Sequence, residues 1–313
     1  MRKICYILFV SVITLLSGCT EATLYDRDEG YIQIIPEWET LNTAAPKSTY
    51  YYFYRDGRLW EPSATETSGE GYTGTLPTGT YNVLMHNTDC PMVSQQEMED
   101  FLQAKMHADA RSVDKTSKLF CEQDTYSLAL EDVVIECHKT TILHPDPQRL
   151  NRTVTMAFTI DLPREFTKVS GELQGVYPSA YLTNGMPAVD DESAFYAVDF
   201  EAPITRNEGS TDLKLFGIRD PGNGTKYKNV VNLTLIDYLQ TSFGVPVDIS
   251  NTITEILKEY GGMIPMGTHI TIPIRISQQG PSEDPVSGDI EEKAIVAEVE
   301  PWISDGTGSG VVQ

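Results

Sequence analysis

The stretch YTGTLPTGTYNVLMHN, residues 72–87, predicts two β-strands joined by a tight turn. Pro77 occupies the second position of the turn, where its ring presets φ, and Gly79 suits the fourth position. Thr80–Met85 then leaves the turn as a run of β-branched, aromatic and aliphatic residues, which is typical of a strand. This part of the chain therefore forms a hairpin of antiparallel strands.

The residues around this hairpin also favour β-structure, with one exception. Further strands are predicted at 31–35, at the tyrosine-rich run 49–54 and at 133–143. The exception is 94–111, where Ser94 and Glu97 have the spacing of a capping box. Met98, Phe101, Leu102 and Met106 follow at helical spacing. We therefore expect one amphipathic helix here, its apolar stripe packed on the sheet.

The second half of the chain begins after His144-Pro145-Asp146-Pro147, which interrupts the strand pattern. Val154, Met156, Phe158 and Ile160 alternate and predict one buried face of a strand over 152–160. Further strands are expected at 169–182 (bent), 194–200, 212–218, 230–236, 269–276 and 293–299. About seven strands separated by turns favour a sandwich. A helix is expected from Asp248 to Gly261-Gly262, with Ile249, Ile253, Ile256 and Leu257 on its apolar face.

These patterns predict a mostly β protein of two tandem β-sandwich domains, transthyretin-like or Greek-key, with one short helix inserted in each. The first domain is predicted to span 31–147 and the second 148–304. Residues 305–313 are expected to be a flexible tail, and 278–288 a polar hairpin loop. The chain of 313 residues is long enough for two domains of ordinary size.

Residues 1–18 are a predicted signal peptide. Arg2 and Lys3 precede the apolar run 4–16, which is shorter than the ~20 residues that a membrane span needs. Leu16-Ser17-Gly18-Cys19 then resembles a bacterial lipobox, which predicts cleavage between Gly18 and Cys19. We expect diacylglycerol on the Cys19 thiol and a further acyl chain, such as palmitate, on its amine, because stable anchoring takes at least two chains. An ordinary secretory signal with a chance cysteine is the alternative.

The residues after Cys19 favour a position outside the cell. Thr20 stands where an aspartate would suggest inner-membrane retention, so the outer membrane is preferred. The stretch 19–30 is acidic, as in surface lipoproteins of the Bacteroides type, although a solvated linker would also be acidic. Removal of 1–18, with the two charges of Arg2 and Lys3, takes the formal net charge from -22 to -24. Such a charge repels nucleic acid and anionic membrane surfaces.

Motifs for catalysis or cofactor binding are lacking, and no cofactor or metal is expected. The five cysteines exclude a disulfide scaffold, because only Cys90, Cys121 and Cys137 remain after processing and lipidation. Cys137, His138, His144 and Cys121 do not have the spacing of a zinc site. The acidic run 190–192 lacks the regular oxygen spacing of a calcium loop. Solvated turns and buried thiols are the preferred interpretation.

The tyrosines at 50, 51, 52 and 54 suggest a glycan-binding surface, because aromatic faces stack on sugars. Alternate residues of a strand face opposite sides, however, so we expect two of the four to be core residues.

Taken together, these features resemble those of Bacteroidales fimbria-associated lipoproteins, the FimB-type anchor and accessory subunits and their relatives. The resemblance rests on the lipobox and on a set of residues in both halves: Trp38, Leu76, Pro77, Gly79, Tyr81, Asn87, Arg152-Thr153-Val154, Ser170–Leu173 and Trp302.

The resemblance implies two tandem β domains, no enzymatic activity and a role in anchoring, capping or decorating surface fimbriae. Pilin subunits are the implied partners, joined by strand addition, in which shaft subunits lose their N-terminal strand after a basic residue. Arg27 lies near that position, but cleavage there would release the lipid, so an anchor subunit is expected to keep its first strand. A surface glycan-binding lipoprotein, with a host or other glycan as ligand, is the alternative function, and a lipoprotein hydrolase is a third.

A Cys19→Ala variant tests the lipid anchor. It removes the thiol that accepts diacylglycerol, so the protein should lose palmitate labelling and be shed into the medium. Labelled or membrane-retained mutant protein would contradict the lipidation of Cys19.

Overall fold

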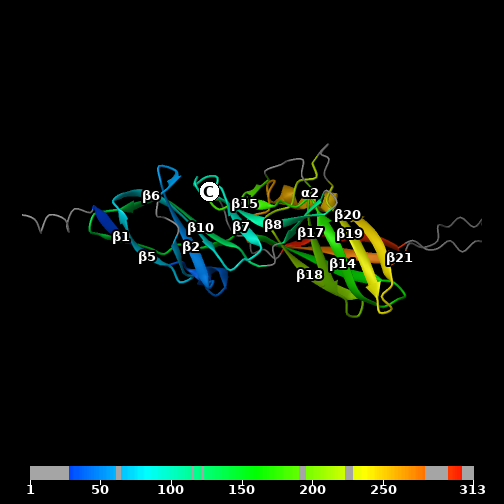
Figure 1. The fold of residues 1–313 in the computed structure, drawn as a ribbon. Helices are drawn as coiled ribbons and strands as arrows, with labels where there is room; N and C mark the ends of the chain where they lie inside the picture. Colours follow the sequence, from blue (N-terminus) through cyan, green and yellow to red (C-terminus); the bar gives the residue numbers. More distant parts are fainter. Residues whose placement is uncertain are drawn as a thin grey trace, which may run out of the picture.

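The computed structural model describes residues 28–60, 65–113, 116–120, 123–189, 195–222, 228–278 and 295–304. The molecule is elongated, with β1 (Glu29–Ile34) at one end and β19 (Val230–Asp237), β20 (Ser242–Asp248) and β21 (His269–Gln278) toward the other (Figure 1). Among the described residues, strands dominate and form four sheets. The predicted mostly β sandwich fold is confirmed.

The first sandwich is built from a three-stranded and a six-stranded sheet. The smaller sheet has the order β11 (Thr140–Leu143), β1, β5 (Tyr72–Pro77). The larger has the order β12 (Gln148–Arg149), β10 (Tyr126–Ile135), β6 (Gly79–Asn87), β2 (Ser48–Arg55), β3 (Arg58–Leu59), with β4 (Thr65–Ser68) also paired to β2. The strands predicted on both sides of the 77–79 turn are β5 and β6.

The second sandwich is built from a five-stranded and a nine-stranded sheet. The five-stranded sheet has the order β18 (Glu208–Leu215), β13 (Arg152–Asp161), β21, β22 (Ile295–Val299), with β23 (Ile303–Ser304) also on β21. The nine-stranded sheet has the order β16 (Pro187–Ala188), β15 (Ser179–Tyr181), β8 (Lys105–Val113), β9 (Thr116–Phe120), β17 (Phe195–Pro203), β14 (Phe166–Gln174), β19, β20, with β7 (Val93–Gln96) on β8.

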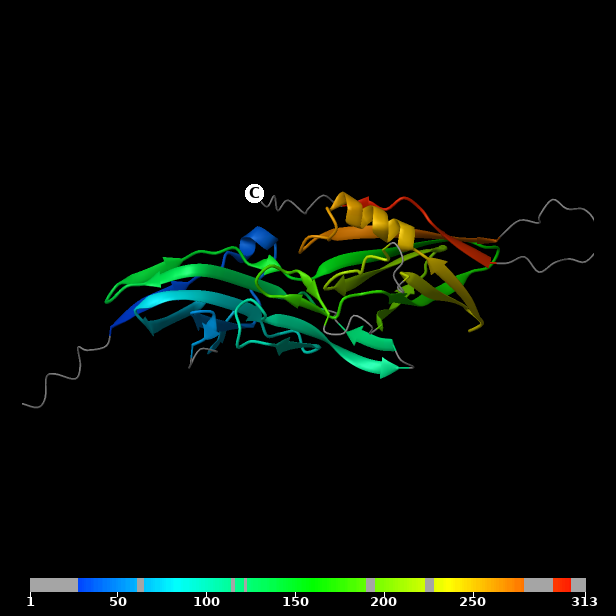
Figure 2. The same cartoon turned by 90° about the horizontal axis from the view of Figure 1, so that it is seen from above.

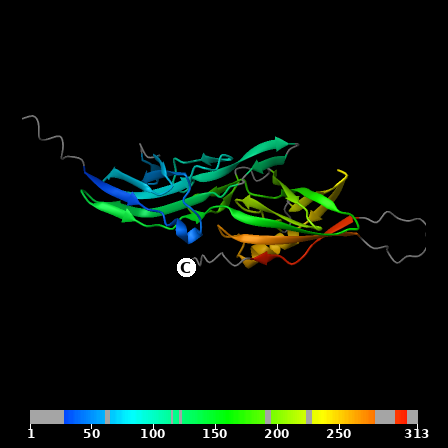
Figure 3. The same ribbon diagram turned by 90° about the horizontal axis from the view of Figure 1, so that it is seen from below.

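The β8–β9 hairpin joins the two halves of the chain. Although it lies before residue 147, β8 pairs with β15 and β9 pairs in parallel with β17, both of the second half. The cyan hairpin reaches along the green strands of the second half in Figures 2 and 3. The β8–β9 hairpin and β12 therefore both pair across the predicted division at residues 147 and 148.

Two hydrophobic cores hold the sheets together. The smaller contains Ile32 and Ile34 of β1, Leu76 of β5, and residues of β2, β6 and β10. The larger fills the second sandwich and extends to Tyr52, Tyr54 and Leu84 of the first half through Phe101, Ala104 and Met106. The second core is therefore continuous across the two halves.

The helix predicted after Asp248 is confirmed as α2 (Ser250–Glu259). Ile249, Ile253, Ile256 and Leu257 are buried in the larger core. Hydrogen bonds from the side chain and the backbone of Ser250 lower the pKa of the Asp248 carboxyl, and the Ser250 N–H donates to Asp248 Oδ1 at 3.0 Å. Gly261 and Gly262, with φ of 73° and 107°, end the helix in a backbone conformation that favours glycine.

The helix predicted over 94–111 is wrong, since this segment forms β7, a turn and β8. Glu97 has a φ of 55°, and the Leu102 N–H donates to Asp100 Oδ1, so the turn is fixed before a helix can start. Leu102, predicted to be core, is 65% exposed, whereas Ala104, Met106 and Ala108 are buried with a period of two. The pairing of β8 with its neighbours β7 and β9 and with the distant β15 outweighs the local helical spacing. The described part of the first half has only a 3-10 turn, Trp38–Leu41.

Two predicted strands are each split. The segment 133–143 forms the end of β10 and all of β11, which lie in different sheets and are separated by a turn in which His138 has a φ of 56°. The segment 169–182 likewise forms most of β14 and, after Gly175 with a φ of 80°, β15.

Several predicted features lie outside the described residues: the signal peptide, Gly18, Cys19, Arg27, Cys121, the acidic run 190–192, most of the loop 278–288 and all of the tail 305–313. Within the described ranges, no helix is long and apolar enough to cross a membrane.

The shared core predicts that the two halves unfold together. Heating the purified chain should give one calorimetric transition, because separating the halves would expose Tyr52, Tyr54 and the partners of β8 and β9. Two resolved transitions would show that the cores are independent.

Candidate functional site

Strand β1 is the place where the chain leaving the predicted anchor enters the fold. It is the central strand of its sheet, parallel to β11 and antiparallel to β5. Ile32 and Ile34 are fully buried, and their side chains face the strands β2, β6 and β10 of the opposite sheet. Burial of these two side chains contributes roughly 1.5–3 kcal/mol each.

Backbone bonds secure β1 at both ends. The Tyr31 N–H donates to Lys139 O at 2.8 Å and the Ile35 N–H to Leu143 O at 2.9 Å. At the start of the strand the Thr78 N–H donates to Asp28 O at 2.7 Å. Displacement of β1 would break these bonds and open a groove between β5 and β11, because both strands pair with β1. The strand therefore fills the position between β5 and β11 itself.

The residues behind the family resemblance mostly have structural roles. The Trp38 indole N–H donates to Gly69 O at 2.8 Å, and its ring meets Tyr126 edge-on at 5.4 Å. The Tyr81 hydroxyl donates to Pro77 O at 3.0 Å and so closes the turn between β5 and β6.

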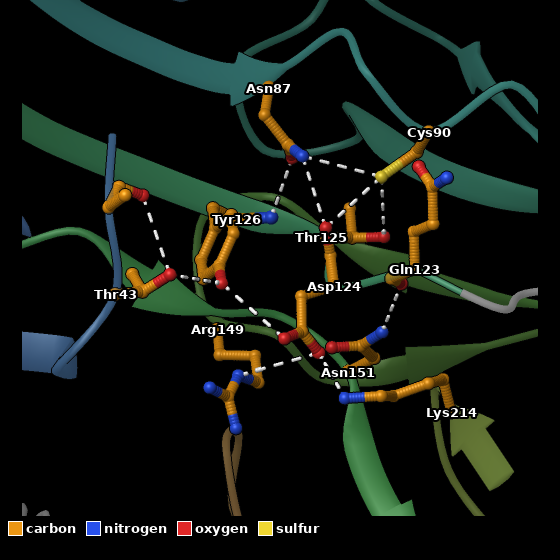
Figure 4. A network of polar contacts seen from close by, with 11 residues as sticks. Thr43, Asn87, Cys90, Gln123, Asp124, Thr125, Tyr126, Arg149, Asn151 and Lys214 are labelled. Atoms are coloured by element: carbon orange, nitrogen blue, oxygen red, sulfur yellow. Dashed lines mark hydrogen bonds and ion pairs between the residues drawn. The ribbon is translucent and has the colours of Figure 1, made fainter. Parts of the chain in front are cut away.

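Asn87 begins a polar network between the two halves, which we call the polar joint (Figure 4). Its side-chain oxygen accepts from the Tyr126 N–H at 2.7 Å, and its amide donates to Asp124 O at 3.1 Å. The Asp124 carboxylate then meets Lys214 Nζ of β18 at 2.5 Å and Arg149 Nε at 3.6 Å. Asn151 extends the joint by donating to Gln123 O at 2.9 Å.

Arg152 follows the joint and has a buried guanidinium. It donates to four backbone carbonyls, those of Leu150, Phe216, Gly185 and Ile264, at 2.7–3.0 Å. Burial lowers its pKa to about 10. The four acceptors come from four separate segments, so Arg152 fixes the loops that surround the start of β13.

Asn87 and Arg152 are among the residues that carry the family resemblance, whereas the sequence did not indicate Asp124, Arg149 and Lys214. Each of the three is an ordinary surface residue type with no periodic signal, and only the packing of the two halves brings them together.

The predicted tyrosine surface is mostly interior. Tyr51 faces the smaller core, whereas Tyr52 and Tyr54 face the larger one, and all three are buried. Burial raises the pKa of Tyr52 to about 12. Tyr50 alone of the four is partly exposed, so burial removes three of the four tyrosines on which the glycan hypothesis was based.

The thiols and histidines considered for metal binding are dispersed. Cys90 is buried, its Sγ lies 3.1 Å from Asp124 O, and burial raises the pKa of the thiol. Cys137 is exposed and donates to Asp28 Oδ1 at 3.6 Å. Among the described residues, no three His, Cys, Asp or Glu side chains come together as metal ligands.

An open hollow of about 850 Å³ lies beside the end of β1. Its charged lining is Glu37, Glu39, Glu70 and His144, with His144 Nδ1 3.8 Å from Glu37 Oε1. Both side chains are about half exposed, so water screens the attraction between them.

Neither family models nor curated proteins match this sequence. Solved structures do share its fold. A candidate adhesin from Bacteroides ovatus is 16% identical with a TM-score of 0.56, over 88% of this chain and 98% of the other. The fimbrial anchor protein Mfa2 from Porphyromonas gingivalis is 12% identical with a TM-score of 0.50, over 87% of this chain and 96% of the other.

The chain therefore shares its fold with this adhesin and this fimbrial protein. At these identities the likeness extends to the arrangement of both sandwiches and not to individual site residues.

An Asp124→Ala variant tests the polar joint. Arg149 Nε is buried and Lys214 is mostly buried, so the loss of their shared carboxylate should lower the free energy of unfolding by about 1–3 kcal/mol. Glu201→Ala is the control, because its pair with Lys168 is solvent-exposed and should cost below ~1 kcal/mol in denaturant unfolding. Equal effects of the two substitutions would contradict a role for the joint in stability.

Proposed function

We propose that this protein is a non-enzymatic surface lipoprotein that acts as a fimbrial anchor, accessory or adhesion subunit. In this proposal lipid on Cys19 holds it in the outer membrane, and pilin subunits are its partners. The observation that carries the proposal is that β1 fills its own groove, paired on both sides, where the chain from Cys19 enters the fold.

A retained β1 suits an anchor for a mechanical reason. A pull on the tether acts along β1, and its hydrogen bonds to β5 and β11 lie across that direction, so they resist as a group. Ile32 and Ile34 must also leave the core before the strand can slide. The strand therefore passes force from the lipid into the sandwich.

Because β1 occupies its own groove, the protein cannot accept a donor strand from another subunit there. A subunit that accepts a donor strand needs an empty groove, and here the groove is occupied. A protein of this kind ends a chain of subunits at the membrane and does not extend it. The fold shared with the fimbrial anchor Mfa2 is consistent with this position.

Pilin release tests the proposal. In cells carrying Cys19→Ala, pilins that crosslink to this protein should leave the cell surface together with it. Cys137→Ala is the matched control, because it removes an exposed thiol that is not in the lipobox and should leave pilins on the cell. Pilins that stay cell-bound in the Cys19→Ala strain, or a protein that never crosslinks to pilin, would reject the anchor function.

A further inference from the structure

The outer face of the three-stranded sheet has an uncharged centre. Side chains alternate along β1, so Tyr31 and Gln33 point away from the core that receives Ile32 and Ile34. Their register partners complete the surface, which we call the neutral face: Tyr31, Gln33, Thr73, Thr75, Thr140 and Ile142. Glu29 borders it at the start of β1.

The neutral face is exposed and its polar groups are unused. Tyr31 and Ile142 are each 54% exposed, although both are large and partly apolar. Among the residues that the structure describes, no hydrogen bond engages the hydroxyls of Tyr31, Thr73, Thr75 and Thr140 or the amide of Gln33. Donors and acceptors thus surround one aromatic ring and remain available to a ligand.

The backbone beneath the neutral face is rigid. Tyr31 lies on the central strand, between Thr75 of β5 and Thr140 of β11, and Gln33 lies between Thr73 and Ile142. Pairing on both sides fixes the direction of each side chain, so a ligand would meet a preformed surface.

The charge of the neutral face differs from that of the rest of the chain. The formal net charge is -22, and the outer face of β14 and β17 has Lys168, Glu172 and Glu201 in neighbouring positions. The neutral face has no cation for an acidic glycan or phosphate and no carboxylate for a basic peptide. An uncharged ligand with many hydroxyls fits it best.

The size of the neutral face favours a small ligand over a second copy of the chain. Neighbouring strands lie ~4.8 Å apart, so the three strands span roughly 10 Å across the sheet. Each strand contributes two residues, two positions apart, and at ~3.3 Å per residue their Cα atoms are roughly 7 Å apart along the strand. A stable dimer needs about 800 Å² per partner, which is several times larger. One or two sugar rings match this area.

We propose that the neutral face binds a neutral saccharide, with a sugar ring stacked on Tyr31 and its hydroxyls bonded to Gln33 and the flanking threonines. The C–H groups of a sugar pack on an aromatic face, and Ile142 extends the apolar contact. This site is separate from the tyrosine cluster of β2. It does not depend on the anchor function, because binding is measured on the purified chain.

Titration of the purified chain with neutral oligosaccharides tests this site. The panel consists of α-glucan, β-glucan and mannan hexasaccharides, with oligogalacturonate as the acidic probe. At least one neutral member should bind, and Tyr31→Ala should weaken it about tenfold, equivalent to ~1.4 kcal/mol. Tyr31→Phe should retain most of the affinity, since it keeps the ring.

Tyr238→Ala is the matched control, because Tyr238 is 65% exposed on the β19–β20 turn, away from this sheet, and its loss should leave binding unchanged. Circular dichroism of each variant checks that the fold persists. No binding by any neutral hexasaccharide, equal loss with Tyr238→Ala, or preference for oligogalacturonate would overturn the proposal. So would self-association of the chain that Tyr31→Ala abolishes, which would make the neutral face a contact between copies.

Discussion

Strand β2 has both of its faces buried, and this constraint joins the two halves of the molecule. Tyr51 and Phe53 enter the smaller core, while Tyr52 and Tyr54 enter the larger one. A strand with one wet face would need polar residues at alternate positions, whereas a strand between two cores needs a continuous apolar and aromatic run. The Tyr50–Tyr54 segment is such a run, and the segment that covers its second face contains Phe101, Ala104 and Met106.

Polar contacts also hold the two halves together. Asp124 receives Lys214 and Arg149, and Arg152 saturates four carbonyls from four segments. These groups lie where the chain passes from the first sandwich to the second, so the Asp124 carboxylate and the four carbonyls have polar partners at this crossing. The two halves are therefore fixed by apolar contact through β2 and by charge at the polar joint.

Both proposed functions depend on β1. Its inner face seals the smaller core through Ile32 and Ile34, and this favours an anchor that keeps its first strand. Its outer face presents Tyr31 and Gln33 to solvent within an uncharged surface. Under these two proposals one strand serves both attachment and recognition, because alternate side chains point to opposite sides of the sheet.

The sequence by itself determined the strand-rich class, the 77–79 turn and the helix after Asp248, because proline, glycine and apolar periodicity act through local backbone geometry. It also predicted the lipobox at Cys19 from residue order alone. Only the tertiary structure decided that 94–111 forms most of β7 and β8, since β8 pairs with the distant β15 as well as with its neighbours β7 and β9. The same holds for Asp124 with Lys214, 90 residues apart, and for the burial of Tyr52 and Tyr54. Such contacts depend on which distant strand covers which face, and this information is not present in any single stretch of the chain.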